Sequence, residues 1–209
     1  MNNHFITLGN LGLCVAASLN AQRLFKDHRA PAAGIFLVVC SAALSVLPAT
    51  ISLDWSSQPA ALCADLQWAA EVLSPAMVSF GFLWLSDDHF TAYTLLTGSA
   101  LLSMLTGWLS RDGLSVMSRC MAMSSLSCSL TVCLFAGNPL GILGSVLLSA
   151  PALVGLSGTS PLVSPEAAGG LLKLGLIGAM TVGCWAIRWA LEIYVQDLKG
   201  WDKSNNILT

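Results

Sequence analysis

Charged side chains are scarce in this sequence. Of its 209 residues, 10% are Asp, Glu, Lys or Arg and 55% are hydrophobic, whereas a soluble domain carries about 25% charged residues. The mean hydropathy is +0.73. This composition excludes an ordinary water-soluble globule and predicts a protein that lies in the lipid bilayer. The few Lys and Arg are scattered and the net charge is −2, so we expect no nucleic-acid partner.

Signatures of metal binding and catalysis are also missing. The seven cysteines form no CxxC pair, so they are interpreted as small buried hydrophobic side chains rather than as a metal or redox centre. The chain contains no HExxH or GxSxG sequence, which are signatures of zinc proteases and serine hydrolases. We therefore expect no metal and no cofactor, and a non-enzymatic role rather than an enzymatic one.

Long apolar stretches are what the sequence does contain. At roughly 20 apolar residues for each membrane crossing, the chain has room for about seven spans and none for a soluble domain. The sequence predicts an all-α polytopic transmembrane helix bundle over residues 1–195 and a polar cytoplasmic tail at 196–209. The expected spans are about 5–24, 31–53, 66–85, 90–109, 114–136, 140–156 and 171–195. Pro151 and the short sixth stretch leave a re-entrant segment as the alternative there.

Basic residues near the ends of the spans predict the orientation. The first connection contains Arg23, Lys26 and Arg29, and the tail contains Lys199 and Lys203. The positive-inside rule places both regions in the cytoplasm, and the predicted spans separate them by an even number of crossings. The N-terminus is then lumenal or extracellular and the C-terminus cytoplasmic. The short spans favour the endoplasmic reticulum, with the plasma membrane as the alternative.

Glu71 is the candidate for an ion path or a ligand site. It lies about one and a half turns into the third expected span, where a carboxylate by default marks an ion path, a charge pair or a ligand site. Pro75 lacks the N–H that would bond the Glu71 carbonyl in a regular helix, which favours a polar pocket. Asn10 and Asn20 of the first span should face other helices and are the candidate partners of Glu71. The alternative is a hydrated or hydrogen-bonded Glu71 near the interface.

Spacing in the later spans indicates helix packing. Arg188 and Glu192 are one helical turn apart and are predicted to form a structural ion pair. Small residues recur at i+4 spacing in two stripes, which let helix backbones approach closely. The stripes are Gly137, Gly141 and Ser145, and Gly175, Ala179 and Gly183. They serve packing within the bundle or, as the alternative, contact in an oligomer.

The polar turn after the third expected span carries side chains that suit a metal site or acid–base catalysis. These are Asp87, Asp88 and His89, with His28 predicted on the same side of the membrane. Three adjacent residues at the start of a helix cannot all face one site, however. Ser86, Asp87 or Asp88 would instead serve as the N-cap of the following helix.

Two long segments, with a third short one, resemble a known family. They are FGFLWLSDDHFTAYTLLTGSALLSMLTGWLSRDG and LFAGNPLGILGSVLLSAPALVGL, followed late in the chain by CWAIRWAL. They place an aromatic-rich span end, a short polar turn with Asp, a Gly-bearing span and an Asn-aliphatic-Gly span in succession. This pattern covers about residues 30–156 and is similar to the vertebrate transmembrane protein 276 family. The resemblance implies an integral membrane protein and supplies no catalytic residue.

These observations support three hypotheses about function. The leading one is a non-enzymatic accessory or assembly subunit whose spans pack against a second copy or a partner membrane protein. The alternative is a carrier or channel for a small solute or a proton that uses Glu71. The second alternative is an intramembrane lipid enzyme that uses the Asp87–His89 turn.

Overall fold

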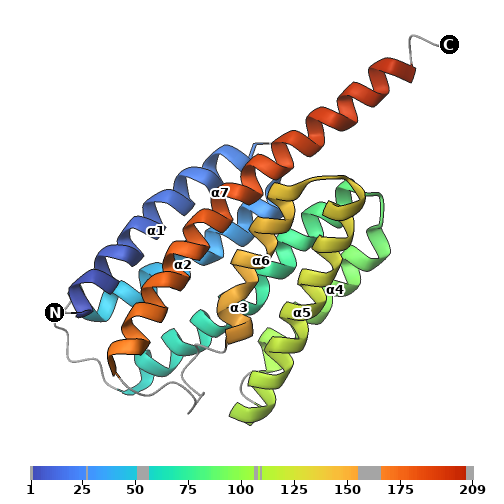
Figure 1. The fold of residues 1–209 in the computed structure, drawn as a ribbon. Coiled ribbons are helices and arrows are strands. Elements are labelled where there is room, and N and C mark those ends of the chain that lie inside the picture. The colour runs from blue at the N-terminus through green and yellow to red at the C-terminus, as the bar shows by residue number, and fades with distance from the viewer. Residues whose placement is uncertain are drawn as a thin grey trace.

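The described chain folds into a bundle of α-helices (Figure 1). The structure is a computed structural model, and it describes residues 2–26, 28–50, 57–105, 108, 110–154 and 166–205. Within these ranges there is no β-strand. The helices are α1 Asn2–Leu24, α2 Arg29–Thr50, α3 Ser57–Leu85, α4 His89–Met104, α5 Arg111–Phe135, α6 Pro139–Val154 and α7 Glu166–Asn205. The predicted all-α bundle is confirmed.

The helices differ in their capacity to cross a bilayer. Five are long and apolar enough by length and composition. Their apolar segments are Phe5–Leu24, Arg29–Val46, Trp68–Leu85, Asp112–Phe135 and Gly170–Asp197. By contrast, α4 and α6 have 16 residues each. The predicted fourth span reached residue 109, but α4 ends at Met104, while α6 continues through Pro151 to Val154.

Helix α3 is the centre of the bundle and packs against α2, α4, α5, α6 and α7. Its closest neighbour is α2, because glycines on both helices remove the side chains that would separate them. A Cβ at Gly34 of α2 would lie 3.0 Å from the Ser74 carbonyl, and one at Gly81 of α3 would collide with the Pro31 ring. These pairs run in opposite directions along the two helices, so α2 and α3 are antiparallel.

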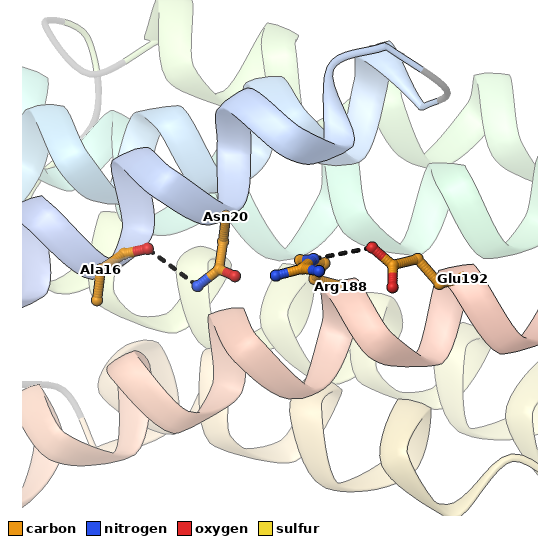
Figure 2. A network of polar contacts seen from close by, with 4 residues as sticks. All are labelled: Ala16, Asn20, Arg188 and Glu192. Atoms are coloured by element: carbon orange, nitrogen blue, oxygen red, sulfur yellow. Dashed lines mark hydrogen bonds and ion pairs between the residues drawn. The ribbon is translucent and has the colours of Figure 1, made fainter.

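Helix α7 packs antiparallel to α6 and parallel to α1. Gly144 of α6 meets Ile187, and a Cβ at Gly9 of α1 would lie 3.2 Å from Leu174. Asn20, near the other end of α1, lies beside Arg188 (Figure 2). The C-terminal ends of α1 and α7 therefore lie at the same end of the bundle (Figure 1).

The basic residues of the first connection lie at the end of the bundle from which α7 leaves. Arg23, Lys26 and Arg29 are all exposed there. The first connection and the end of α7 must lie on the same side of the membrane if an even number of spans separates them, and this placement agrees with that requirement.

Two groups of buried side chains form the core, and α3 contributes to both. The larger group joins α1, α2, α3, α5, α6 and α7 and includes the fully buried Ile35, Phe82 and Ile187. The smaller group joins α3 to α4 through Leu83 and Leu95. The central position of α3 follows from its apolar residues, which cover most of its circumference.

A buried serine cluster joins α3 to α5. Ser79 Oγ lies 2.8 Å from the carbonyl oxygens of both Pro75 and Ser125, and 2.6 Å from Ser129 Oγ. A hydroxyl has one proton, so the Ser79 hydroxyl shares its proton between the two carbonyl oxygens and accepts the proton of the Ser129 hydroxyl. The sequence analysis missed this cluster. Its signal is a helical stripe of small residues on α5, all of them buried: Ser118, Ala122, Ser125, Ser129 and Cys133.

Candidate functional site

Glu71 lies at a small cleft between four helices. Its described lining has three polar side chains, which are Ser41 from α2 and Glu71 and Ser74 from α3. Apolar residues of α6 and α7, among them Pro151 and Met180, form the opposite wall. The unfilled space, including the open mouth, is about 270 Å³, and the enclosed part has room for about one water molecule. We call this the Glu71 cleft.

Local sequence explains why a cleft forms at this position. Pro75 in α3 and Pro151 in α6 both line it, and each removes an N–H from its helix. Glu71 itself is half-buried. Ser74 is 3% exposed, and its hydroxyl has no hydrogen-bond partner in the described part of the chain. The cleft thus combines a carboxylate that solvent can reach with a buried, unsatisfied hydroxyl.

Asn10 and Asn20 do not join Glu71. Both are buried on α1, but none of the described residues that line the cleft comes from α1. The side-chain nitrogen of Asn20 donates to the Ala16 carbonyl of its own helix at 2.9 Å. The reason is topological: α1 packs against α2 and α7, whereas the cleft opens between these helices and α3 and α6. The predicted grouping of these three residues is therefore not formed.

Arg188 and Glu192 form a contact between neighbouring turns of α7. Arg188 Nε donates to Glu192 Oε1 at 2.8 Å, and the two side chains are 14% and 37% exposed. The guanidinium also lies 5.5 Å from the centre of the Trp189 ring. Figure 2 shows the Asn20 amide beside the guanidinium, with its carbonyl oxygen turned toward it. The partly buried guanidinium thus has an acceptor in Glu192 and a ring contact in Trp189 on its own helix.

The Asp87–His89 turn has a structural role in the described chain. Asp88 is the N-cap of α4 and accepts the Thr91 N–H at 3.2 Å. These hydrogen bonds from Thr91 hold the pKa of the Asp88 carboxyl below its usual range. His89 stacks on Trp84 with ring centres 4.1 Å apart. Asp87 has a left-handed backbone with φ 68° and a 98% exposed side chain.

The same turn does not assemble a metal site. His89 Nε2 lies 3.8 Å from Asp87 Oδ1, whereas Asp88 caps α4. The described residues contain no group of three His, Cys, Asp or Glu that could hold a metal ion. His28 of the α1–α2 turn adds no such group. The hypothesis of an intramembrane lipid enzyme at this turn gains no support from the geometry.

The small-residue stripes are only partly used for contacts inside the chain. A Cβ at Gly141 would collide with the Cys133 thiol, and one at Gly183 would lie 3.3 Å from the Leu148 nitrogen. Ser145 is buried and Ala179 half-buried.

Two of the predicted glycines have other surroundings. Gly137 belongs to the α5–α6 turn, where φ is +63°, and no neighbour lies within 4 Å of a Cβ placed there. Gly175 is likewise open. Among the described residues neither glycine serves a close helix contact, because Gly137 lies outside α6 and Gly175 is exposed.

The α5–α6 turn contains an anchor that the sequence analysis missed. The Asn138 side chain is 5% exposed, and its nitrogen donates to the Ala190 carbonyl of α7 at 2.8 Å. Its oxygen accepts the Gly141 N–H at 3.1 Å and so caps α6. The sequence signal for this cap is Asn138 directly before Pro139, the first residue of α6.

Mammalian proteins called transmembrane protein 276 are similar to this chain. The human protein is 27% identical over 147 residues, which is 70% of this chain and 73% of the human protein. The bovine protein is 27% identical over the same length, 72% of its own chain. The rat protein is 26% identical over 153 residues, 73% of this chain and 76% of the rat protein. No family profile matches the chain, and no solved structure matches it.

The comparisons agree with the resemblance seen in the sequence, which is confirmed. The names of the relatives describe transmembrane proteins, and the described chain contains five helices that can cross a membrane. The chain is therefore a multi-pass integral membrane protein.

Proposed function

We propose that this membrane protein is a non-enzymatic accessory or assembly subunit that binds a partner membrane protein or a second copy of itself. The observation that carries the proposal is the length of α7. This helix has 40 residues, which corresponds to about 60 Å at 1.5 Å per residue. A bilayer core of about 30 Å needs half of that.

The last turns of α7 reach beyond the other helices. Its apolar segment ends at Asp197, but the helix continues to Asn205, so most of the predicted polar tail is helical. Figure 1 shows these turns clear of the bundle. Short helical segments are marginally stable in water by themselves. A helix that leaves the bundle therefore gains stability from a contact outside this chain.

The base of this extension is held firmly. Asn138 bonds the Ala190 carbonyl, and Arg188 and Glu192 form their ion pair at the same level. The extension thus starts from a fixed point and direction, which lowers the entropy lost when a partner binds.

Truncation of α7 tests the proposal. We compare the full chain with one that ends at Asp197 and with a control that ends at Asn206, each purified in mild detergent. Light scattering gives the mass of the protein component. We expect the full chain and the control to form a defined oligomer or a stoichiometric complex with one membrane protein, and the Asp197 chain to be monomeric. A monomeric full chain with its own catalytic turnover would contradict the proposal.

A carrier or channel for a small solute or a proton is the second candidate function, and the Glu71 cleft favours it. The test is flux into proteoliposomes for the wild type, Glu71→Gln and the control Asp112→Asn, which changes an exposed carboxylate in the first turn of α5. Flux that is lost only in Glu71→Gln would support this function. Flux that persists in Glu71→Gln would show that transport does not use the Glu71 carboxylate.

A further inference from the structure

We propose that the place where α1 and α7 meet, beside Arg188, binds the headgroup of one anionic phospholipid. The Arg188 guanidinium holds the lipid phosphate by hydrogen bonds, and Arg23 balances its negative charge. We call this the Arg188 site. It does not rest on the partner role proposed for the α7 extension, because its residues lie on α1 and on the part of α7 inside the bundle.

The Arg188 guanidinium has more donors than the described chain satisfies. A guanidinium carries five N–H groups. The Nε group donates to Glu192 Oε1 at 2.8 Å, and this is the one hydrogen bond from the Arg188 side chain to the described residues. The N–H groups of the two terminal nitrogens therefore have no acceptor there. Since the side chain is only 14% exposed, donors left without an acceptor are costly, and this edge of the guanidinium indicates an open ligand position.

The open edge suits a phosphate at the level of the lipid headgroups. Terminal N–H groups of a guanidinium match two oxygens of one phosphate. Figure 2 shows Glu192 on one side of the guanidinium and the Asn20 amide of α1 on the other. The adjacent Trp189 is 40% exposed, and exposed Trp side chains in membrane helices concentrate at the headgroup level. This turn of α7 is therefore placed where a lipid phosphate lies.

Arg23 supplies the charge that the phosphate requires. Arg188 and Glu192 already balance each other, so a phosphate bound beside them needs a further cation. Arg23 is exposed and lies on the turn of α1 that follows Asn20, the α1 residue beside Arg188 in Figure 2. A long flexible Arg side chain in this position can reach a headgroup.

The charge around Arg23 selects an anionic lipid rather than a zwitterionic one. Residues 23–29 contain three basic side chains and one acidic side chain, which leaves a net charge of +2 with His neutral. By contrast, the α3–α4 turn contains Asp87 and Asp88, so the basic charge is confined to the α1 side. The positive-inside rule assigns the basic connection to the cytoplasm, and the cytoplasmic leaflet contains the anionic lipids.

Thermal unfolding of the full chain in an uncharged detergent provides the first test. A ligand that binds only the folded state raises the melting temperature. We expect a rise of about 3 °C or more with saturating phosphatidylglycerol and none with phosphatidylcholine at the same mole fraction. Inorganic phosphate at the same concentration should give no rise. An equal rise with inorganic phosphate would overturn the proposal, because the ligand would then be a free anion.

Three variants locate the response. Arg188→Lys keeps the charge but loses the paired N–H groups, so the half-saturating fraction of phosphatidylglycerol should increase about tenfold. Arg23→Gln changes an exposed side chain and should increase it about fivefold. Lys173→Gln, which removes an exposed base near the other end of α7, is the matched control and should keep the wild-type value. If Arg188→Lys fails to fold, Arg23→Gln decides.

The same half-saturating fraction in Arg23→Gln, Lys173→Gln and the wild type would overturn the proposal, because the lipid would then be attracted without a site.

Native mass spectrometry provides a second test that needs no variant. The full chain is released from detergent that contains equal amounts of phosphatidylglycerol and phosphatidylcholine. We expect each chain to retain one phosphatidylglycerol molecule in preference to phosphatidylcholine. Equal retention of the two lipids would overturn the proposal. Monomers and oligomers have different masses and are analysed separately, so the result does not depend on association through α7.

Discussion

Single glycine residues show how closely the helices of this protein approach one another. A Cβ at Gly144 would lie 2.8 Å from two side-chain carbons of Ile187 and 2.9 Å from its backbone nitrogen. A flexible side chain can move aside, but a backbone atom moves only with its helix. Gly178 of α7 is the opposite case, because nothing lies within 4 Å of a Cβ there.

We therefore expect Gly144→Ala to destabilise the bundle by about 1–3 kcal/mol, the range seen when a packed contact is overfilled. The control Gly178→Ala should be neutral or stabilising by up to about 1 kcal/mol, since Ala is the better helix former. Unfolding of both variants in mixed micelles with increasing denaturing detergent measures the difference. Equal stabilities would show that α6 and α7 are less tightly packed than the structure indicates.

Asp88 predicts a pH dependence at the start of α4. Its pKa is lowered because the ionised carboxylate accepts hydrogen bonds from Thr91. The Asp88 carboxylate therefore contributes its full stabilisation at a pH above its pKa in the unfolded state, which is near 4. This stabilisation is lost as the pH falls through the lower pKa of the folded state.

The variant Asp88→Asn keeps a capping side chain but cannot titrate. We expect the melting temperature of the wild type to approach that of Asp88→Asn as the pH falls from 6 to 3 (roughly the window set by the two pKa values). If the difference in melting temperature between the two proteins stays constant across this window, the Asp88 cap is not the source of the pH dependence.

At the scale of the helices, the serine cluster is a buried polar connection between α3 and α5. Interhelical hydrogen bonds in membrane proteins contribute about 0.6 kcal/mol on average and up to about 1.7 kcal/mol. Ser79 takes part in bonds to two carbonyls and one hydroxyl, so its loss also leaves the Ser129 hydroxyl with one partner fewer.

Ser79→Ala should consequently destabilise the protein by about 1–2 kcal/mol. Ser127→Ala is the matched control, because Ser127 lies on the exposed face of α5 and should stay within about 0.5 kcal/mol of the wild type. A double-mutant cycle of Ser79→Ala with Ser129→Ala measures their coupling. Additive effects would mean that the two hydroxyls do not interact.

Much of the element order could be predicted from the sequence, since apolar length is a local property of the chain. The Arg188–Glu192 pair could be predicted for the same reason, because side chains four residues apart on a helix lie next to each other. The predicted fourth span ends at about 109, while α4 ends at Met104. Residues 106, 107 and 109 lie outside the described residues, so this boundary stays a prediction.

The grouping of residues from different helices could not be predicted. Glu71 was found from its cost in an apolar span, but its neighbours depend on which helix faces it. Asn10 and Asn20 have the right chemistry and lie on α1, which does not reach the cleft. Ser74 gave no signal, because a serine in a membrane helix ordinarily bonds its own backbone, as Ser79 and Thr181 do.

At the scale of the whole molecule, the parallel arrangement of α1 and α7 leads to a prediction about topology. The basic first connection and the end of α7 share one end of the bundle, and the positive-inside rule assigns that end to the cytoplasm. We expect a glycan acceptor site added before Asn2 to be modified in cells and one added after the last residue to remain unmodified. The reverse pattern would show that the protein has the opposite orientation.

The shortness of α6 changes the depth at which Glu71 lies. Sixteen residues rise about 24 Å, several ångströms less than the hydrocarbon thickness, and such hydrophobic mismatch thins the surrounding bilayer. The last turns of α6, at Pro151 and Ala152, form one wall of the cleft. If α6 crosses the bilayer, we expect this thinning to bring headgroups and water toward Glu71 on this side of the protein. Thin membranes should then hydrate the Glu71 carboxylate, and thick, sterol-rich membranes should bury it.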